Sequence, residues 1–201
     1  SAASTARLAF TTREPIGVVV SLSAFNHPLN LIVHQTIPAL AAGSPVIVKP
    51  AAATPLSCLS LVELMYKAGL PRHYCQALIL NNSLAEKLAT DSRVAYLSFI
   101  GSAKVGWYLR SKLAAGTRCA LEHGGVAPVI VDIEPSLPPD EVEDFLDKLV
   151  PPLSKGAFYH AGQVCVSVKR IYLPQAHAAR FAEKLAEAAV KLKVGKAEDK
   201  D

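Results

Sequence analysis

The sequence predicts an α/β fold, in which a sheet of parallel strands is joined by crossover helices. Short apolar runs that are typical of buried strands alternate with longer segments whose apolar residues recur at helical spacing. Hydrophobic residues make up 51% of the 201 residues, which is ample for a packed core. This alternation is the pattern of a Rossmann-like sheet.

The expected elements follow the chain in order, and the residues at their ends suit their positions. Strands are predicted at 16–22, 45–48, 76–80, 94–99, 117–120 and 128–131, and helices at 28–42, 55–68, 83–90 and 102–115. Pro55 suits the first turn of a helix that Thr54 caps, because the N–H that proline lacks would be unbonded there. Gly43 and Gly69 suit helix ends.

A change of composition after Gly125 predicts a boundary between two domains. Residues 1–125 are expected to form the Rossmann-like domain, and residues 126–201 the beginning of a second α/β domain. After the strand at 128–131, the second domain should contain a proline-rich turn at 134–140 and helices at 140–150 and 174–192. Because paired prolines interrupt helices and sheet ladders, an insertion within segment 133–152 is expected on the surface.

Composition and charge argue against several classes of protein. The 21 basic residues are dispersed among 17 acidic ones, without a basic run interleaved with aromatics, so we expect no nucleic-acid partner. No apolar stretch reaches the roughly 20 residues of a membrane span, and no secretory signal is visible. The four cysteines and six histidines lack metal-site or disulfide spacing, so we expect no metal and a reducing, cytoplasmic location.

Two motifs together supply a thiol and a carboxylate. The first is Gly162-Gln163-Val164-Cys165, and the second is Leu121-Glu122-His123-Gly124-Gly125. A cysteine among small residues can attack a carbonyl carbon, and a glutamate on a glycine-rich turn can activate water. Taken alone, each motif has a simpler interpretation. A single cysteine is more often a small hydrophobic residue, and a glutamate beside two glycines is more often a turn residue.

Three further motifs precede these two in a fixed order. They are Phe25-Asn26-His27-Pro28, Val48-Lys49-Pro50 and Phe99-Ile100-Gly101-Ser102. Together the five motifs resemble the aldehyde dehydrogenase superfamily, from about Glu14 to about Gly195. The resemblance implies NAD(P)-dependent oxidation of a small-molecule aldehyde to a carboxylic acid, and it identifies the second domain as the N-terminal part of a catalytic domain.

The resemblance also implies a role for three residues. Cys165 would attack the aldehyde, and the Asn26 amide with the Cys165 N–H would stabilise the thiohemiacetal oxyanion. After hydride transfer to the nicotinamide, Glu122 would activate the water that hydrolyses the thioester. From its local sequence alone, Asn26 has a simpler role as an Asx-turn before His27-Pro28.

Cofactor residues are expected where strands end. Gly101 and Ser102 end a strand and open a helix, whose free N–H groups attract a pyrophosphate, although Ser102 can also serve only as a cap. Lys49 ends another strand, and by resemblance it would bind the adenine ribose. Many family members have a glutamate three residues later, where this chain has Ala52. A carboxylate there would repel a 2′-phosphate, so either NAD or NADP is expected as the cofactor.

Two other functions stay open at this point. The chain could be a non-catalytic nucleotide-binding or interaction module, or an acyl-transferring or reductive member of the same fold. The only methionine is Met65, so Ser1 is not expected to be an ordinary translation start. By resemblance, the chain is expected to be an interior fragment that also lacks the C-terminal catalytic and oligomerisation region. The full-length enzyme is expected to be a homo-oligomer. Which aldehyde it uses is not indicated.

Overall fold

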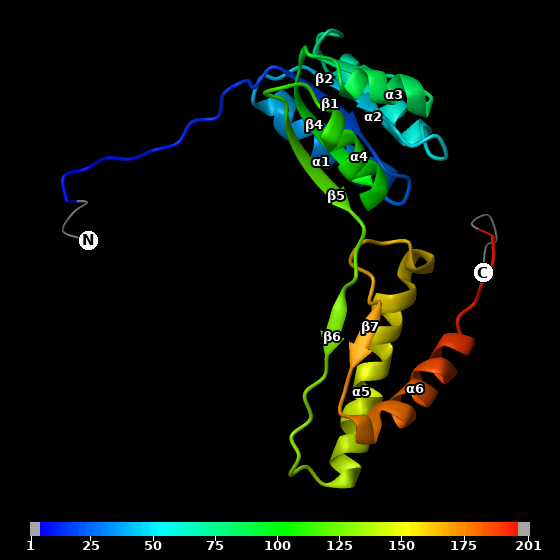
Figure 1. Cartoon of the computed structure of the whole chain (residues 1–201). Helices are drawn as coiled ribbons and strands as arrows, with labels where there is room; N and C mark the ends of the chain where they lie inside the picture. The colour runs from blue at the N-terminus through cyan, green and yellow to red at the C-terminus, as the bar shows by residue number, and fades with distance from the viewer. Residues whose placement is uncertain (1–4, 197–201) are drawn as a thin grey trace. The chain divides into compact units, whose positions relative to one another are not determined.

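The computed structural model describes residues 5–196, and the chain divides into two compact units (Figure 1). The units are Ser1–His123 and Gly124–Asp201. The sequence predicts a boundary at Gly125, and the division falls between the two residues that precede it. Each unit has its own sheet and its own hydrophobic core.

The first unit is built on a five-stranded sheet, in the order β3-β2-β1-β4-β5, in which all neighbouring strands are parallel. The strands are β1 Val18–Leu22, β2 Val46–Lys49, β3 Cys75–Ala77, β4 Val94–Gly101 and β5 Arg118–His123. The helices between them are α1 Pro28–Ala41, α2 Leu56–Lys67, α3 Asn82–Ala89 and α4 Ala103–Lys112. This topology confirms the predicted parallel sheet with crossover helices.

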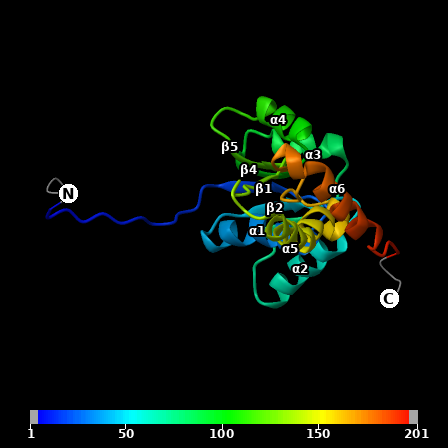
Figure 2. The ribbon, with the colours of Figure 1, turned by 90° about the horizontal axis from the view of Figure 1, so that it is seen from below.

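Both faces of this sheet are covered, with α1 and α2 on one side and α3 and α4 on the other (Figure 2). Successive side chains of a strand point to opposite faces, so neighbouring valines of β1 enter different cores. Val19 packs with Ile32 of α1, and Val20 packs in the cluster that contains Leu109 of α4. Because both faces are buried, the inner strands β1, β2 and β4 are mostly apolar runs rather than alternating ones.

Leu97 lies on β4 beside the central strand and is fully buried. Leu97→Ala should therefore lower the free energy of unfolding by about 2–5 kcal/mol, because it removes buried apolar atoms and leaves a cavity. Urea denaturation of the chain would measure this loss. Leu84→Ala on α3 is the matched control, because Leu84 is 49% exposed. Equal losses for the two variants would contradict this assignment of the core.

A buried polar contact fixes α1 against the sheet. The Gln35 side chain donates from Nε2 to the Leu22 carbonyl at 3.2 Å and to the Ser98 carbonyl at 3.0 Å. The Ser21 hydroxyl donates to the Gln35 carbonyl at 3.1 Å. Since buried polar groups are costly unless they are bonded, these contacts specify one position of α1 on β1 and β4.

The ends of the helices follow the sequence prediction, with one difference. Gly43 and Gly69 follow α1 and α2 with φ angles of +81° and +99°, the left-handed conformation expected there. The N-cap of α2 is Pro55 instead of the predicted Thr54. The Thr54 hydroxyl donates to the Phe25 carbonyl at 3.4 Å, so it serves a contact outside the helix.

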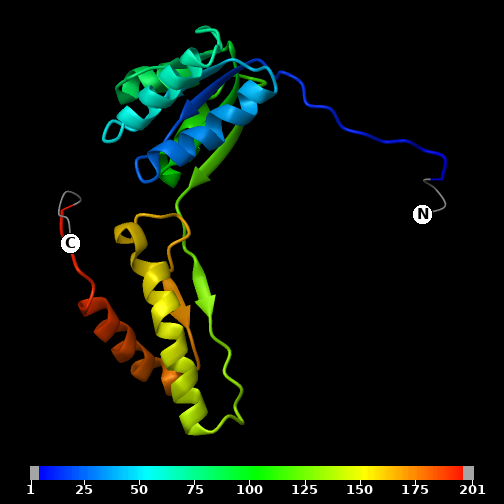
Figure 3. The same cartoon turned by 180° about the vertical axis from the view of Figure 1, so that it is seen from behind.

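The second unit contains a parallel pair of strands, β6 Pro128–Ile130 and β7 Arg170–Tyr172. Helix α5 Pro139–Phe158, the 3₁₀ turn η2 Tyr159–Gly162 and helix α6 Gln175–Val190 complete it. Figure 3 shows α6 running alongside α5. Arg180 and Lys184 of α6 pair with Glu143 of α5 at 2.9 and 2.7 Å, and Phe181 is buried in the core between these elements.

The predicted surface position of segment 133–152 holds for its prolines, which are all exposed, but not for the segment as a whole. Ile133 and Leu146 are buried in the core, and α5 continues through Pro151 and Pro152. The two prolines remove the N–H groups that would bond the carbonyls of the exposed residues 147 and 148, where water can replace them. The free energy gained when α5 packs in the core outweighs the loss of these two backbone hydrogen bonds. Within residues 5–196, no helix combines the length and apolar content that crossing a membrane requires.

Candidate functional site

Most of the predicted site residues gather at one edge of the five-stranded sheet. Because its strands are parallel, their carboxyl ends lie along the same edge, the usual ligand-binding edge of an α/β sheet. Leu22 at the end of β1 lies between Lys49 and Phe99 of the neighbouring strands, and Ile100 lies beside Glu122. The structure therefore brings the ends of β1, β2, β4 and β5 together in the first unit.

Asn26 lies in the connection between β1 and α1 and is half-buried. Pro28 occupies the first turn of α1, and the Leu31 N–H bonds the His27 carbonyl at 2.9 Å. The Gln35 contacts hold this helix on the sheet. The β1–α1 connection is thus fixed at both sides, which places Asn26 at the carboxyl edge.

Lys49 is the last residue of β2. Its ammonium donates to the adjacent Pro50 carbonyl at 3.0 Å, and its side chain is half-buried. Ala52 follows in an exposed turn before α2. The lysine is therefore a cation at the ligand-binding edge, and the turn beside it carries no acidic side chain from residue 50 to residue 55.

Gly101 and Ser102 join β4 to α4. Gly101 ends the strand, and Ser102 is the N-cap of the helix, where its hydroxyl accepts the Val105 N–H at 3.4 Å. This confirms that Ser102 caps α4. The first-turn N–H groups of the ten-residue helix face the same carboxyl edge, where the helix dipole is positive.

Glu122 and His123 end β5 and point to opposite faces of the sheet, because strand side chains alternate. Glu122 is exposed, whereas His123 is half-buried and packs against the Trp107 ring at a centroid distance of 5.3 Å. A methyl group on Gly106 would come within 2.7 Å of the His123 ring. His123 therefore holds the end of β5 against α4, and Glu122 is left facing solvent.

Cys165 lies in the second unit, in a tight turn after η2. The turn spans residues 164–167 and is closed by a bond from the Ser167 N–H to the Val164 carbonyl at 3.0 Å. Cys165 is exposed, and Ser167 is buried. The structure therefore presents the thiol at the surface of the second unit on a closed turn.

The residues just before this turn have an unusual backbone. His160, Ala161 and Gly162 have φ angles of 55°, 54° and 69°. Left-handed conformations cost about 1–2 kcal/mol for residues with a Cβ, so His160 and Ala161 are strained. Such strain is typical of functional sites, where the surrounding structure holds it.

Lys169 ties this segment to the rest of the unit, a contact that the sequence did not predict. Its ammonium donates to the Gly162 carbonyl at 3.0 Å, and its backbone N–H donates to the Ala127 carbonyl at 3.0 Å. The Val168 N–H donates to the Gly156 carbonyl of α5 at 3.1 Å. The turn that carries Cys165 is therefore anchored both to α5 and to the residues that enter β6.

The four cysteines differ in their surroundings. Burial raises the pKa of Cys58 to about 11, with Cys75 adding to the rise, and burial likewise raises the pKa of Cys75 to about 11. Both thiols are therefore protonated at neutral pH and unreactive. Cys119 is half-buried and packs on the core, whereas Cys165 is exposed. Only Cys165 combines exposure with one of the predicted catalytic motifs.

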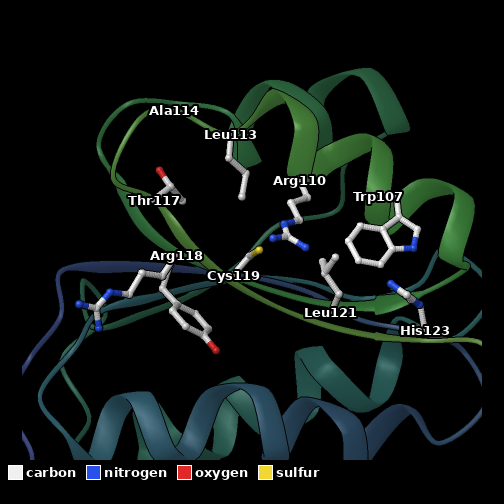
Figure 4. Close-up of a pocket in the computed structure, with 10 residues that line it drawn as sticks. Trp107, Arg110, Leu113, Ala114, Thr117, Arg118, Cys119, Leu121 and His123 are labelled. Carbon is white, nitrogen blue, oxygen red and sulfur yellow. The ribbon is translucent and has the colours of Figure 1, made fainter.

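A cavity of about 780 Å³ lies between α4 and β5 in the first unit (Figure 4). Trp107, Arg110, Cys119 and His123 are among its lining residues. Of the predicted site residues, none lines it, although His123 at the end of β5 brings the cavity up to the carboxyl edge. Among residues 5–196, no group of three or more potential metal ligands is close enough to hold a metal ion.

Comparison with known proteins gives a consistent set of matches. The model of the aldehyde dehydrogenase family matches residues 1–201. A 3-sulfolactaldehyde dehydrogenase of Priestia megaterium is 41% identical over 191 residues, which are 94% of this chain and 38% of that protein. A succinate-semialdehyde dehydrogenase [NADP(+)] of Escherichia coli is 36% identical over 185 residues, 91% of this chain and 36% of that protein.

A solved structure shows the same fold. The aldehyde dehydrogenase of Mycobacterium tuberculosis complexed with NAD⁺ matches with a TM-score of 0.81 and 30% identity, over 94% of this chain and 37% of that one. The chain thus spans less than two fifths of the length of the relatives that it matches.

Proposed function

We propose, from the premise that this chain belongs to the aldehyde dehydrogenase family, that the full-length protein oxidises an aldehyde to a carboxylic acid with NAD or NADP as acceptor. The relatives named above act on different aldehydes, so the proposal extends to aldehydes as a class. The main support from the structure is the exposed Cys165 thiol on its closed turn, in contrast to the buried Cys58 and Cys75.

Three residues carry out the chemistry in this proposal. The Cys165 thiolate forms a bond to the aldehyde carbon, and the resulting oxyanion is stabilised by the Asn26 amide and the Cys165 N–H. The nicotinamide, when bound, accepts the hydride. Glu122 then takes a proton from water, whose oxygen attacks the thioester carbon. The C–S bond breaks, the carboxylic acid is released, and the Cys165 sulfur takes back the proton from Glu122.

The carboxyl edge of the first unit suits a dinucleotide. The first turn of α4 offers N–H groups and a positive dipole end to a pyrophosphate, and Lys49 supplies a cation and hydrogen-bond donors on the neighbouring part of the edge. We therefore assign residues 1–125 as the NAD(P)-binding domain and residues 126–201 as the first part of the catalytic domain. Gly101 and Ser102 shape the start of α4.

The direct test is aldehyde-dependent reduction of NAD or NADP by the full-length protein, followed by the absorbance of the reduced nicotinamide. A nucleotide-binding module without catalysis would bind the dinucleotide and leave it oxidised, which would contradict the proposal. The cytoplasmic location and the homo-oligomeric state stay predictions from the sequence and its resemblance.

Ala52→Glu should weaken NADP binding by about tenfold or more and leave NAD binding nearly unchanged, because it places a carboxylate near the expected 2′-phosphate. Each bound nucleotide raises the thermal midpoint by mass action, so midpoints with and without each nucleotide report the change. Ala53→Glu, at the next exposed position, is the matched control. If wild type binds NAD much more tightly than NADP, the argument from Ala52 is wrong.

A further inference from the structure

The turn that carries Cys165 has a defined central peptide. The turn residues are Val164, Cys165, Val166 and Ser167, and the Ser167 N–H to Val164 carbonyl bond closes it. In such a turn the second and third residues share a peptide group whose carbonyl is not used by the closing bond. Here that carbonyl belongs to Cys165, so the closing bond alone does not fix its direction.

Gly125 lies directly against this carbonyl, in the same unit. A Cβ at Gly125 would be 1.7 Å from the Cys165 oxygen, 2.7 Å from its carbonyl carbon and 3.2 Å from its Cα. All three are backbone atoms, which cannot swing aside as the end of a long side chain can. Only a residue without a side chain fits at position 125 while the turn keeps this geometry.

We propose that Gly125 is a positioning residue that sets the orientation of the Cys165 turn by allowing its central peptide to pack against the backbone. The inference rests on the proposed role of Cys165 as nucleophile. A side chain at position 125 would push the turn away by more than about 1 Å, and a misplacement of this size can lower a rate on the order of 10²-fold.

The turn cannot relieve this clash by moving as a whole. Its C-terminal side is bonded from the Val168 N–H to the Gly156 carbonyl and from the Lys169 N–H to the Ala127 carbonyl. Its N-terminal side is held by the Lys169 ammonium on the Gly162 carbonyl at 3.0 Å. The displacement would therefore be shared between the exposed residues around position 125 and the peptides of the turn, and with these peptides the thiol and the Cys165 N–H would move.

The test is Gly125→Ala in the full-length protein, measured as the single-turnover rate of acylation with kcat and KM. We expect acylation and kcat to fall on the order of 10²-fold, while the thermal shift given by NAD or NADP stays as in wild type. The rate at which iodoacetamide alkylates Cys165 should also differ between Gly125→Ala and wild type. Gly116→Ala is the control for an added methyl group without a clash, because the Cβ at Gly116 would meet nothing within 4 Å. Gly116 has a φ of +87°, so this control includes a backbone strain that Gly125→Ala does not.

A second variant keeps the test decisive if Gly125→Ala does not fold. Val166 is 74% exposed and shares the central peptide, so Val166→Gly should loosen that peptide without disturbing the core. We expect it to lower the acylation rate, and Val166→Ala to lower it less. Wild-type acylation and alkylation rates in Val166→Gly or in a folded Gly125→Ala would overturn the inference. Aldehyde oxidation that survives Cys165→Ala would instead overturn the proposed function.

Discussion

Replacing Cys165 with alanine should reduce aldehyde oxidation to background. The substitution removes the atom that forms the covalent bond to the aldehyde, and losing a covalent nucleophile typically costs on the order of 10⁶-fold in kcat. Aldehyde-dependent formation of reduced nicotinamide by the full-length protein would measure the loss. Binding of NAD or NADP, followed by thermal midpoint, should persist because the proposed cofactor residues lie in the first unit.

Cys119→Ala is the matched control for this variant. Cys119 is a half-buried thiol that lines the cavity beside α4, so its loss should leave oxidation intact. Cys58 and Cys75 cannot substitute for the missing nucleophile, because burial raises the pKa of each to about 11. Undiminished oxidation by Cys165→Ala would refute the covalent mechanism.

Replacing Glu122 with glutamine should separate the two halves of the reaction. The amide cannot take a proton from water, so the thioester on Cys165 should form and then persist. We expect one burst of reduced nicotinamide, equal in amount to the enzyme sites, and then a steady rate lower by roughly 10²- to 10⁴-fold. Stopped-flow absorbance would record both phases.

Hydroxylamine offers a direct check on this variant, because it attacks a thioester without help from a general base. Its addition should restore turnover in Glu122→Gln by releasing the acyl group as a hydroxamic acid. Glu187→Gln, at an exposed position on α6, is the control and should behave like wild type. A Glu122→Gln enzyme with full steady-state turnover would show that another group activates the water, or that the acyl group leaves to another acceptor.

The sheet and its helices could be predicted because local pattern and long-range packing agree in the first unit. The inner strands of that unit are apolar on both faces, and glycines end α1 and α2. In the second unit, local sequence pattern and long-range packing disagree. Pro151 and Pro152 predict the end of a helix, but burial of Leu146 and Leu153 on either side of them favours its continuation. Single-residue preferences could not reveal this packing.

The placement of Asn26, Lys49, Ser102 and Glu122 at one edge follows from the parallel topology, which the sequence pattern already indicates. Their roles remain proposals. The contact of Gly125 with Cys165 could not be predicted, because it joins residues far apart in the sequence through backbone atoms alone. The two adjacent glycines of the motif were its only signal.

The left-handed backbone at residues 160–162 also limits how this segment can evolve. A positive φ excludes β-branched side chains almost entirely and is tolerated best by glycine, asparagine, aspartate and histidine. Random drift at His160 and Ala161 is therefore confined to a small set of residues, unless the backbone changes with it. Variants of this protein that diverge in sequence should therefore change at positions with negative φ and keep small or polar residues at 160 and 161.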